Sequence, residues 1–486
     1  MSRRTVLRGT ARFGWTRAAC GLIAVLLVAG CATRPVNPSI AQWVSTPLDL
    51  QRPGSDAAQR DNLVILAFSG GGTRAAAFSF GVLEALRDIE IQGPLGRKGR
   101  LLDQVDIITG VSGGSFTALA YGLYGDKLFD EYEKRFLKRN VQGELIGRFF
   151  NPGYWGDMAS AGRGRSEVAA DLYDEILFNG ATFADLHKVG GPIINVSATD
   201  ISSGSRFVFN EQNFDVLCAN LAPIRLSRAA AASSAVPVVL SPVTINNYGG
   251  SCGFRPPPWA DRFLNSADPP RPAARVRQRL NELLAFTTGN QPYLHLVDGG
   301  VSDNVGLRGV LDVVTLFEAL HEAGLPTPLD NVRRIVVFVV NSLSTPPSNW
   351  SEVETAPGSI PILIKSAGVP IDRYSGESVE LLKDISARWR LLRQIRDAAT
   401  FGPGDPAIAT YVQRAPKPEL YAIDVSFSAL KDTAEREYLN QLPTSFVLPD
   451  EAVDRLRAAA AKIVRDSPDF QRVLKDAGAR IIETRP

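Results

Sequence analysis

Ser112 has neighbours that favour a role as a nucleophile. It stands in the run GVSGG between Gly110 and Gly114, after an apolar stretch and before small and apolar residues. In a Gly-x-Ser-x-Gly sequence that joins a strand to a helix, the serine occupies a sharp turn and exposes its hydroxyl group. Glycines beside it remove Cβ atoms that would crowd the turn. The pattern predicts a nucleophilic serine, but a glycine-rich join without chemistry fits the same residues.

A serine nucleophile needs a base, and Asp298 is the candidate. The sequence LVDGGVSDN places it directly after an apolar run and before Gly299 and Gly300, which let another segment of backbone come close. A free aspartate, with a pKa of ~3.9, is a poor base. In a site shielded from water it can accept the hydroxyl proton as the new bond forms. The alternative is an ordinary Asp-Gly-Gly turn.

The three histidines of the chain do not fit a Ser-His-Asp triad well. In α/β-hydrolases the triad follows the order serine, acid, histidine, whereas His187 precedes the candidate acid. His295 lies inside the apolar run YLHLV, as a strand residue would. His321 lies near the end of a helical segment, where capping is the expected role. A carboxylesterase with a histidine triad stays open as an alternative.

The sequence SGGGTR supplies a candidate site for the oxyanion. Gly70, Gly71 and Gly72 link an apolar run to the start of a helical segment, so their N–H groups can converge on one oxygen. The rival interpretation is a phosphate cradle. The spacing of the three glycines fits neither of the two common nucleotide-binding motifs, G-x-x-x-x-G-K-[ST] and G-x-G-x-x-G, so the phosphate cradle is disfavoured. Arg74 would hold either the loop or the anion.

The elements that carry these residues alternate between short apolar runs and helical segments. The run NLVILAFSGGG, for example, is followed by apolar residues at helical spacing, namely Phe78, Val82, Leu83 and Leu86. Such alternation predicts α/β layers around a mostly parallel sheet, whose sites lie beyond the carboxyl ends of the strands. The serine, the aspartate and the glycine loop all fall at such ends.

Beyond residue 345 the character of the sequence changes. An amphipathic helix is predicted within 377–397, with one apolar face made of Val379, Leu382, Ile385, Trp389, Leu392 and Ile395. The run ELYAIDVSF predicts a late strand.

Upstream of this region, the stretch LIGRFFNPGYWGD clusters aromatic residues beside proline and glycine. It is interpreted as a lid or a bilayer-contacting edge, or as aromatic side chains packed under a loop.

Together, SGGGTRAAAFSFGVLEAL, GVSGGS and VDGGVSDN, in this order, resemble motifs of the patatin-like phospholipases, and so does AAAASSAVPVVLSPV. The resemblance covers about residues 60–345. It implies a three-layer α/β/α sandwich and an acyl-ester hydrolase that uses a Ser-Asp dyad and no calcium, cofactor or metal ion. The family's glycine loop often begins with Asp and ends with Gly, where this chain has Ser69 and Ala75.

By matching motif, the resemblance implies a role for each candidate residue. Ser112 would be the nucleophile and Asp298 the base. The oxyanion hole would consist of the N–H groups of the three-glycine loop, Gly70, Gly71 and Gly72. The supporting positions would be Arg74, Gly110, Gly114, Gly299 and Gly300.

The first thirty residues have the features of an export signal. Five arginines and no acidic residue precede Cys31, and the apolar run AACGLIAVLLVAG is short for a bilayer span. Small residues before Cys31 resemble the bacterial lipobox, which implies a lipid on this cysteine. Ala32 after it implies sorting to the outer membrane, and the paired arginines weakly resemble a twin-arginine signal. The alternative is an uncleaved N-terminal membrane anchor.

Charge and cysteine content indicate which binding partners and which cellular compartment fit the sequence. Without the five arginines of the signal, 48 basic side chains face 51 acidic ones, so nucleic-acid binding is disfavoured. Cys218 and Cys252 remain after the signal. In an oxidising compartment they would form a disulfide, and otherwise they would be two buried thiols.

We therefore predict a signal peptide over residues 1–30, a tether over 31–60, a patatin-like acyl hydrolase domain over 61–345, and a mainly helical extension over 346–486 that packs on the core. The predicted protein is exported, anchored to a membrane through Cys31, and acts on phospholipids or related lipid esters. Two alternatives are the histidine-dependent carboxylesterase and an envelope scaffold lipoprotein whose site is idle.

Overall fold

A computed structural model describes residues 34–45, 61–92, 98–159, 163–265, 271–345, 348, 350–398 and 406–484. The predicted signal peptide and Cys31 lie outside these residues, and so does most of the predicted tether. Within the described ranges, no helix combines the length and the apolar character that crossing a bilayer requires.

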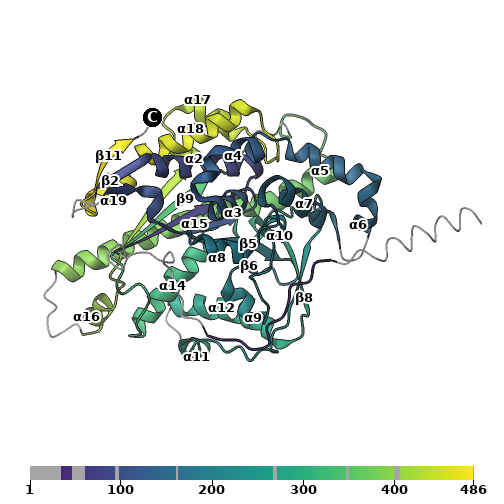
Figure 1. The fold of residues 1–486 in the computed structure, drawn as a ribbon. Coiled ribbons are helices and arrows are strands. Elements are labelled where there is room, and N and C mark those ends of the chain that lie inside the picture. Colours follow the sequence, from purple (N-terminus) through teal and green to yellow (C-terminus); the bar gives the residue numbers. More distant parts are fainter. Residues whose placement is uncertain are drawn as a thin grey trace, which may run out of the picture.

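A mixed sheet forms the centre of the molecule (Figure 1). Within the described ranges it contains eight strands, which are β1 (Asn62–Phe68), β4 (Val105–Val111), β5 (Ile193–Asp200), β6 (Arg206–Phe209), β7 (Val243–Asn246), β8 (Tyr293–Asp298), β9 (Arg334–Asn341) and β10 (Glu419–Ser426). Their order is β10-β9-β1-β4-β5-β8-β7, with β6 paired to β5. The neighbours from β10 to β5 are parallel, whereas β6, β7 and β8 run antiparallel to their partners. The predicted mostly parallel sheet is confirmed.

Successive side chains of the buried strands enter two different cores. In β1, Val64, Leu66 and Phe68 belong to one hydrophobic cluster, and Leu63, Ile65 and Ala67 belong to the other. Side chains alternate between the faces of a strand, so a sheet that is covered on both faces needs continuous apolar runs. This is the physical reason for runs such as NLVILAF.

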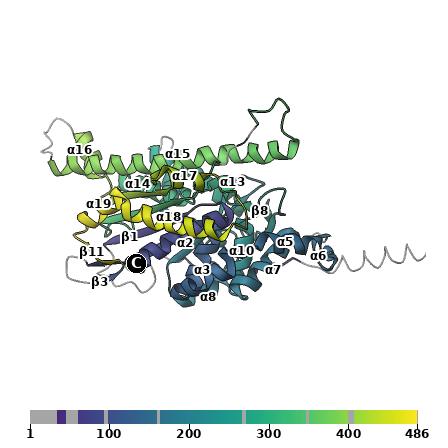
Figure 2. The same ribbon diagram turned by 90° about the horizontal axis from the view of Figure 1, so that it is seen from above.

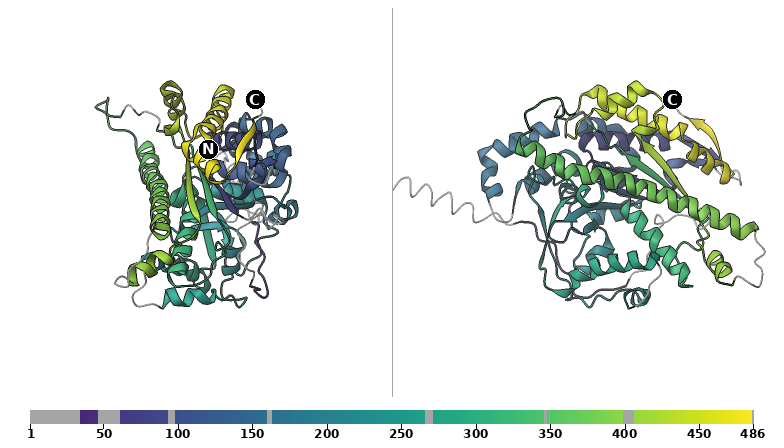
Figure 3. Two further views of the ribbon diagram at one scale, coloured as in Figure 1. Left: turned by 90° about the vertical axis from the view of Figure 1, so that its left-hand side faces the viewer. Right: turned by 180° about the vertical axis from the view of Figure 1, so that it is seen from behind.

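Helices cover both faces of the sheet, as Figures 2 and 3 show. One face carries α2 (Gly72–Asp88), α3 (Gly113–Tyr124), α10 (Leu226–Ser233) and α18 (Asp450–Asp466). The other carries α12 (Arg271–Ala285), α14 (Arg308–Glu322) and the long α15 (Ser359–Ala398). The predicted α/β/α layering is therefore confirmed.

Shorter elements complete the described fold. The helices are α4 (Leu128–Tyr132), α5 (Val141–Phe150), α6 (Trp155–Ala159), α7 (Arg165–Tyr173), α8 (Phe183–Val189), α9 (Glu211–Val216), α11 (Pro258–Leu264), α13 (Gly300–Asp303), α16 (Pro406–Gln413), α17 (Thr433–Asn440) and α19 (Pro468–Asp476). A small sheet has the order β11-β2-β3, formed by β2 (Ile89–Gln92), β3 (Lys98–Arg100) and β11 (Arg480–Thr484).

The residues after 345 are mainly helical, as expected, but they also complete the central sheet. Val379, Leu382, Ile385 and Trp389 are buried on the predicted face of α15. The predicted late strand is β10, which pairs with β9 at the edge of the sheet, and α18 packs against α2. The expected extension is thus continuous with the core, because the apolar run of β10 is buried in the sheet.

Residues 34–45, which we call the strap, lie along the domain, whereas the sequence predicted a tether for 31–60. Ser39 forms a β-bridge with Ala219, and the Ile40 N–H group donates to the Cys218 carbonyl at 2.9 Å. Asn37 is fully buried and exchanges two hydrogen bonds with Asn246, at 2.9 and 2.7 Å. These backbone pairings replace solvent contacts, so the strap is part of the folded domain.

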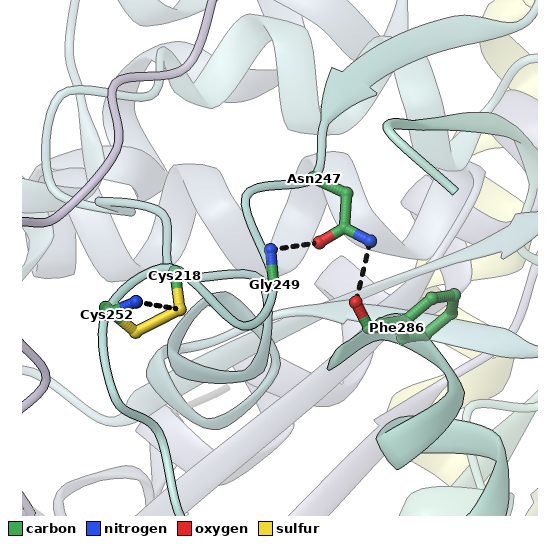
Figure 4. Close-up of a disulfide and its surroundings, with 5 residues drawn as sticks. All are labelled: Cys218, Asn247, Gly249, Cys252 and Phe286. Carbon is green, nitrogen blue, oxygen red and sulfur yellow. Dashed lines mark hydrogen bonds between the residues drawn. A yellow bond between two sulfur atoms is a disulfide. The ribbon is translucent and has the colours of Figure 1, made fainter. Parts of the chain in front are cut away.

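The strap packs on a cross-linked loop, shown in Figure 4. Cys218 and Cys252 form a disulfide, which is the first of the two interpretations offered above. The Cys252 carbonyl accepts the N–H group of Trp43 in the strap at 3.0 Å. Asn247 ties the same loop to the Phe286 carbonyl at 2.8 Å. The disulfide therefore stabilises the surface on which the strap lies.

Candidate active site

Ser112 occupies a strained turn between β4 and α3. Its φ and ψ angles are 48° and −120°, a conformation that costs a non-glycine residue about 1–3 kcal/mol. The backbone around the turn is too close for larger neighbours. A Cβ atom on Gly110 would lie 2.7 Å from the Ser115 Cα atom, and one on Gly114 would lie 2.6 Å from the Ser69 carbonyl oxygen. The expected strand–turn–helix geometry is present at the predicted position.

The sheet brings Asp298 to this turn. Val111 pairs with Ser197 of β5, and the next residue of β5, Ala198, pairs with Asp298 at the end of β8. The Ser112 side chain is close enough to the Asp298 carboxylate to lower the pKa of that group. Ser112 is 6% exposed and Asp298 is 7% exposed. The two candidate residues therefore form a pair that is shielded from water.

Burial raises the pKa of Asp298 to about 6, although the hydrogen bond from the Gly300 N–H group and the nearby Ser112 side chain oppose the rise. The Gly300 N–H group donates to Oδ1 at 2.7 Å. At neutral pH the carboxylate is thus mostly ionised, yet it is a stronger base than an ordinary aspartate. Such a pKa suits a group that must accept a proton from a serine hydroxyl.

Ser233, at the end of α10, organises both parts of the pair and was not singled out from the sequence. Its Oγ atom accepts the Ser112 N–H group at 2.8 Å and donates to the Ser197 carbonyl at 2.7 Å. Its own carbonyl accepts the Gly299 N–H group at 3.1 Å. One residue thereby connects the nucleophile turn, β5 and the loop after Asp298. The only available signal was its place in AAAASSAVP, which no spacing rule marks as functional.

The glycine loop packs directly against the serine turn. A Cβ atom on Gly113 would lie 2.0 Å from the Gly72 carbonyl oxygen, and one on Gly72 would lie 2.3 Å from the Ser445 carbonyl oxygen. Gly71 and Gly72 have φ angles of 139° and 60°, which favour glycine. The loop is therefore held between the helix that follows Ser112 and a C-terminal segment whose role no sequence pattern predicted.

The three N–H groups of the glycine loop are not equivalent. The Gly70 N–H group donates to the Asn304 carbonyl at 2.8 Å, so it is already engaged. Among the described residues, no hydrogen-bond acceptor is found for the N–H groups of Gly71 and Gly72. The expected three-donor oxyanion hole therefore needs a correction: Gly70 fixes the loop, and two donors remain.

Arg74 holds the glycine loop in place. The side chain is buried, and its guanidinium group donates to the carbonyl oxygens of Ser342 and Leu442, both at 2.8 Å, and to the Thr444 hydroxyl at 3.1 Å. Burial lowers the pKa of Arg74 to about 10, so the group stays charged at neutral pH. Of the two roles expected for Arg74, these contacts favour holding the loop.

We expect Arg74→Ala to lower the free energy of unfolding by about 2–4 kcal/mol, since two buried carbonyl groups and the Thr444 hydroxyl lose their donor. Urea unfolding measures this loss. Arg74→Lys should recover only part of the stability because an ammonium group cannot reach three acceptors in a fixed plane. Equal stability of the alanine variant and the parent would contradict this role.

The three histidines lie away from the pair. The His295 ring contacts the Thr244 hydroxyl at 3.1 Å, and the His321 ring lies 3.1 Å from the Asp330 carboxylate. Burial lowers the pKa of His321, and Asp330 opposes this shift. His187 lies on α8. These contacts disfavour the histidine triad. Within the described ranges, no cluster of three or more metal-ligating side chains is found.

Comparison with known proteins assigns the chain to a family. The model of the patatin-like phospholipase family matches residues 66–311, which is half of the chain, so the protein belongs to this family of serine hydrolases that act on ester bonds. A search of curated proteins finds no significant match. The matched range contains the glycine loop, Ser112 and Asp298.

Solved structures similar to the chain are distant. Human GIVD cytosolic phospholipase A2 in complex with methyl gamma-linolenyl fluorophosphonate is 13% identical, with a TM-score of 0.40, and the match covers 86% of this chain and 59% of that chain. VipD from Legionella pneumophila is 12% identical, with a TM-score of 0.28 and coverage of 93% and 72%. The type III effector ExoU is 15% identical, with a TM-score of 0.21 and coverage of 86% and 90%. The present chain thus spans about three fifths of the human enzyme.

Proposed function

We propose that the protein is a lipid acyl hydrolase that cleaves fatty acyl esters of phospholipids with Ser112 as nucleophile and Asp298 as base. The observation that carries this proposal is the buried juxtaposition of these two side chains at a strained strand–helix turn. Membership of the patatin-like phospholipase family supports the substrate class.

In the first step the Ser112 Oγ atom attacks the ester carbonyl carbon, and Asp298 accepts the hydroxyl proton. The N–H groups of Gly71 and Gly72, at the start of α2, stabilise the negative charge on the carbonyl oxygen. The tetrahedral intermediate then breaks its bond to the alcohol part of the lipid, which takes the proton from Asp298. The acyl chain remains as an ester on Ser112.

In the second step a water molecule attacks this ester, and Asp298 accepts a proton from the water. The second tetrahedral intermediate uses the same two N–H donors. When it breaks its bond to Ser112, the serine oxygen takes back the proton from Asp298, and the fatty acid leaves. The cycle needs one ionised carboxylate at the start of each step, which the Asp298 pKa of about 6 provides at neutral pH.

We further propose that the enzyme is exported and anchored through a lipid on Cys31, in the outer membrane. The sequence LVAGC supports this proposal, and so does the disulfide, because disulfides persist in oxidising compartments. The partners are then the membrane and its phospholipids. No nucleic-acid partner is proposed, given the acidic balance of the chain after the signal.

The experiment uses the full chain, purified with detergent from bacterial membranes. Fatty-acid release is measured from vesicles of phosphatidylglycerol and phosphatidylethanolamine, with and without a chelator. In parallel, a fluorophosphonate probe, which bonds to a serine oxygen and expels fluoride, is mapped by mass spectrometry. We expect release that the chelator does not change and a label on Ser112. A label on another residue, or release that needs calcium, would contradict the proposal. Absence of both label and release would favour the idle scaffold.

A further inference from the structure

The strap begins at Arg34, beside the end of the antiparallel β7–β8 pair where Asn246 pairs with Tyr293. Arg34 donates to the Thr244 carbonyl at 3.4 Å, also bonds the Asn246 side chain, and lies over the Tyr293 ring at 5.4 Å. Cys31 precedes Arg34 by three residues, and three residues of chain span at most about 11 Å. A lipid on Cys31 would therefore be held close to the Asn246–Tyr293 end of β7 and β8, whereas a free tether over 31–60 would leave its position open.

This end of the β7–β8 pair lies beyond the carboxyl ends of the parallel strands, at the side of the sheet where Ser112 lies. Because β8 runs antiparallel to β5, Leu296 pairs with Asp200, the last residue of β5, and Tyr293 extends beyond it. At about 3.4 Å per residue, Tyr293 lies about 17 Å from Asp298, outward from the carboxyl ends of the parallel strands. The first residues of the strap also lie at the same end of the molecule as α5 and α6 (Figures 1 and 3).

Exposed apolar side chains gather around the proposed site at this end. The Phe150 side chain is 77% exposed and Trp155 is 55% exposed, whereas Phe149 packs against the core. The four aromatic side chains of the predicted segment thus divide into one that packs inward, the half-buried Tyr154, and two that are exposed. With three exposed valines after α10 and one after Gly300, they form a set that we call the apolar rim: Phe150, Trp155, Val236, Val238, Val239 and Val301.

The loop after α10 that carries Val236, Val238 and Val239 is connected to the catalytic pair and to the aromatic side chains of the rim, Phe150 and Trp155. The Ala235 carbonyl, next to Val236, accepts the Asp298 N–H group at 3.0 Å. Arg165, at the start of α7, donates to the Val238 carbonyl at 3.0 Å, and α7 contacts α6, which begins with Trp155. Val238 has a φ angle of 75°, a strained conformation for a β-branched residue that commonly marks functional loops.

We propose that the apolar rim inserts into the same bilayer that holds the lipid on Cys31, so that the enzyme hydrolyses lipids of the membrane in which it is anchored. This inference rests on the proposed function, and it adds the orientation of the site and the source of the substrate. The rim, the Asn246–Tyr293 end of β7 and β8, and the start of the strap lie at one end of the molecule, so one membrane surface can meet all three. Moving exposed apolar side chains from water into the interfacial region of a bilayer lowers the free energy of the system.

The first test separates the host membrane from other membranes. The lipidated full chain is reconstituted into vesicles of phosphatidylglycerol and phosphatidylethanolamine that contain one acyl label, and enzyme-free vesicles with a second label are added. We expect release from the host vesicles to exceed release from the added vesicles by at least about ten-fold, since the rim faces the host bilayer. Equal release, or more release from the added vesicles, would overturn the proposed orientation.

The second test removes the aromatic part of the rim. Phe150→Ser with Trp155→Ser should lower vesicle hydrolysis, divided by hydrolysis of a water-soluble short-chain ester, by at least about ten-fold. The matched control is Leu391→Ser with Ile408→Ser, whose side chains are 55% and 56% exposed and lie on α15 and α16. In Figures 1 and 2, α16 lies at the opposite end of the molecule from α6. A similar ratio in both variants would overturn the role of the rim.

The third test does not depend on activity, so failure of the proposed function and failure of the rim are distinguishable. Tryptophan fluorescence of the reconstituted chain is recorded with brominated phosphatidylglycerol as quencher. We expect the parent to be quenched more strongly than Trp155→Tyr, because the Trp155 ring enters the bilayer. Identical quenching would overturn the insertion. An enzyme without esterase activity that still shows Trp155-dependent quenching would contradict the proposed function and support the membrane-facing rim.

Discussion

Ser112→Ala is expected to lower kcat/KM for phospholipids and for soluble short-chain esters alike, by at least about 10⁴-fold. The variant removes the atom that forms the acyl-enzyme, and the Asp298 carboxylate then has no hydroxyl group from which to take a proton. The glycine loop and the binding surface remain, so a small residual rate over water is expected. Fatty-acid release and short-chain ester hydrolysis measure both losses.

Ser79→Ala is the matched control for the loss of a buried serine hydroxyl. Ser79 lies on α2, is buried, and its Oγ atom has no hydrogen-bond partner among the described residues. Its replacement should therefore leave kcat/KM within about two-fold of the parent. If Ser112→Ala kept more than about a hundredth of the parental rate, the covalent mechanism would be wrong.

The same position allows the strain of the turn to be measured. Alanine keeps the unfavourable φ angle of 48°, whereas glycine adopts it freely. We therefore expect Ser112→Gly to have a higher free energy of unfolding than Ser112→Ala, by about 1 kcal/mol. Urea unfolding of the two inactive variants gives the difference. A higher free energy of unfolding in Ser112→Gly would show that the backbone is strained at residue 112. The fold would then keep the geometry of the turn at a cost in stability.

Local sequence patterns singled out the residues to which we assign the proposed chemistry. Ser112, Asp298 and the glycine loop each end or follow a short apolar run, and such runs become the buried strands of one sheet. In a sheet the ends of neighbouring strands meet at a shared edge, so residues far apart in the sequence come together there. The alternation of runs and helices therefore predicts both the fold class and the place of the site.

The connections between these segments could not be predicted in the same way. Ser233 holds the serine turn from a position 121 residues further along the chain, and Arg74 reaches a carbonyl 368 residues away. The engagement of the Gly70 N–H group with Asn304 depends on how two loops pack together. Periodicity and turn propensity describe neighbours in the sequence and contain no information about such contacts. The sequence also did not predict the strap as a folded segment, because proline-rich polar segments usually lack persistent structure.

Asp298→Asn is expected to lower kcat/KM by about 10³-fold, within the range that general-base catalysis contributes. The amide keeps a hydrogen-bond acceptor for the Gly300 N–H group but cannot take the Ser112 proton. In the parent, kcat/KM should rise with pH in proportion to the ionised carboxylate and level off above pH 6, since the pKa of Asp298 is about 6. The residual rate of the variant should lack this rise.

The same substitution should stabilise the fold at neutral pH, and the sign follows from the direction of the pKa shift. The folded-state pKa, about 6, lies above the value of ~3.9 for an unfolded aspartate. Below pH ~4 the carboxyl group is protonated in both states, so the charge has no cost. As the pH rises through 6, folding must bury a charged group, at a cost of roughly 2–3 kcal/mol. Asp298→Asn should therefore unfold at higher urea concentration than the parent at pH 8, and at a similar concentration at pH 4.

Asp303→Asn provides the contrast that separates this effect from a general effect of removing a buried carboxylate. Asp303 is also buried, and burial raises its pKa, but its oxygens accept the N–H groups of Leu307 and Arg308 at the start of α14. Asparagine has one acceptor oxygen for these two N–H groups, so one of them loses its partner. This variant should therefore lose stability at pH 8, even though it removes a buried charge, and it should keep the parental pH dependence of kcat/KM. Gain of stability with loss of activity in Asp298→Asn, together with loss of stability and an unchanged pH dependence in Asp303→Asn, would show that the fold bears a cost at the base because catalysis needs an ionised carboxylate in a shielded site. If Asp298→Asn were less stable than the parent at pH 8, the carboxylate would instead contribute to the stability of the fold.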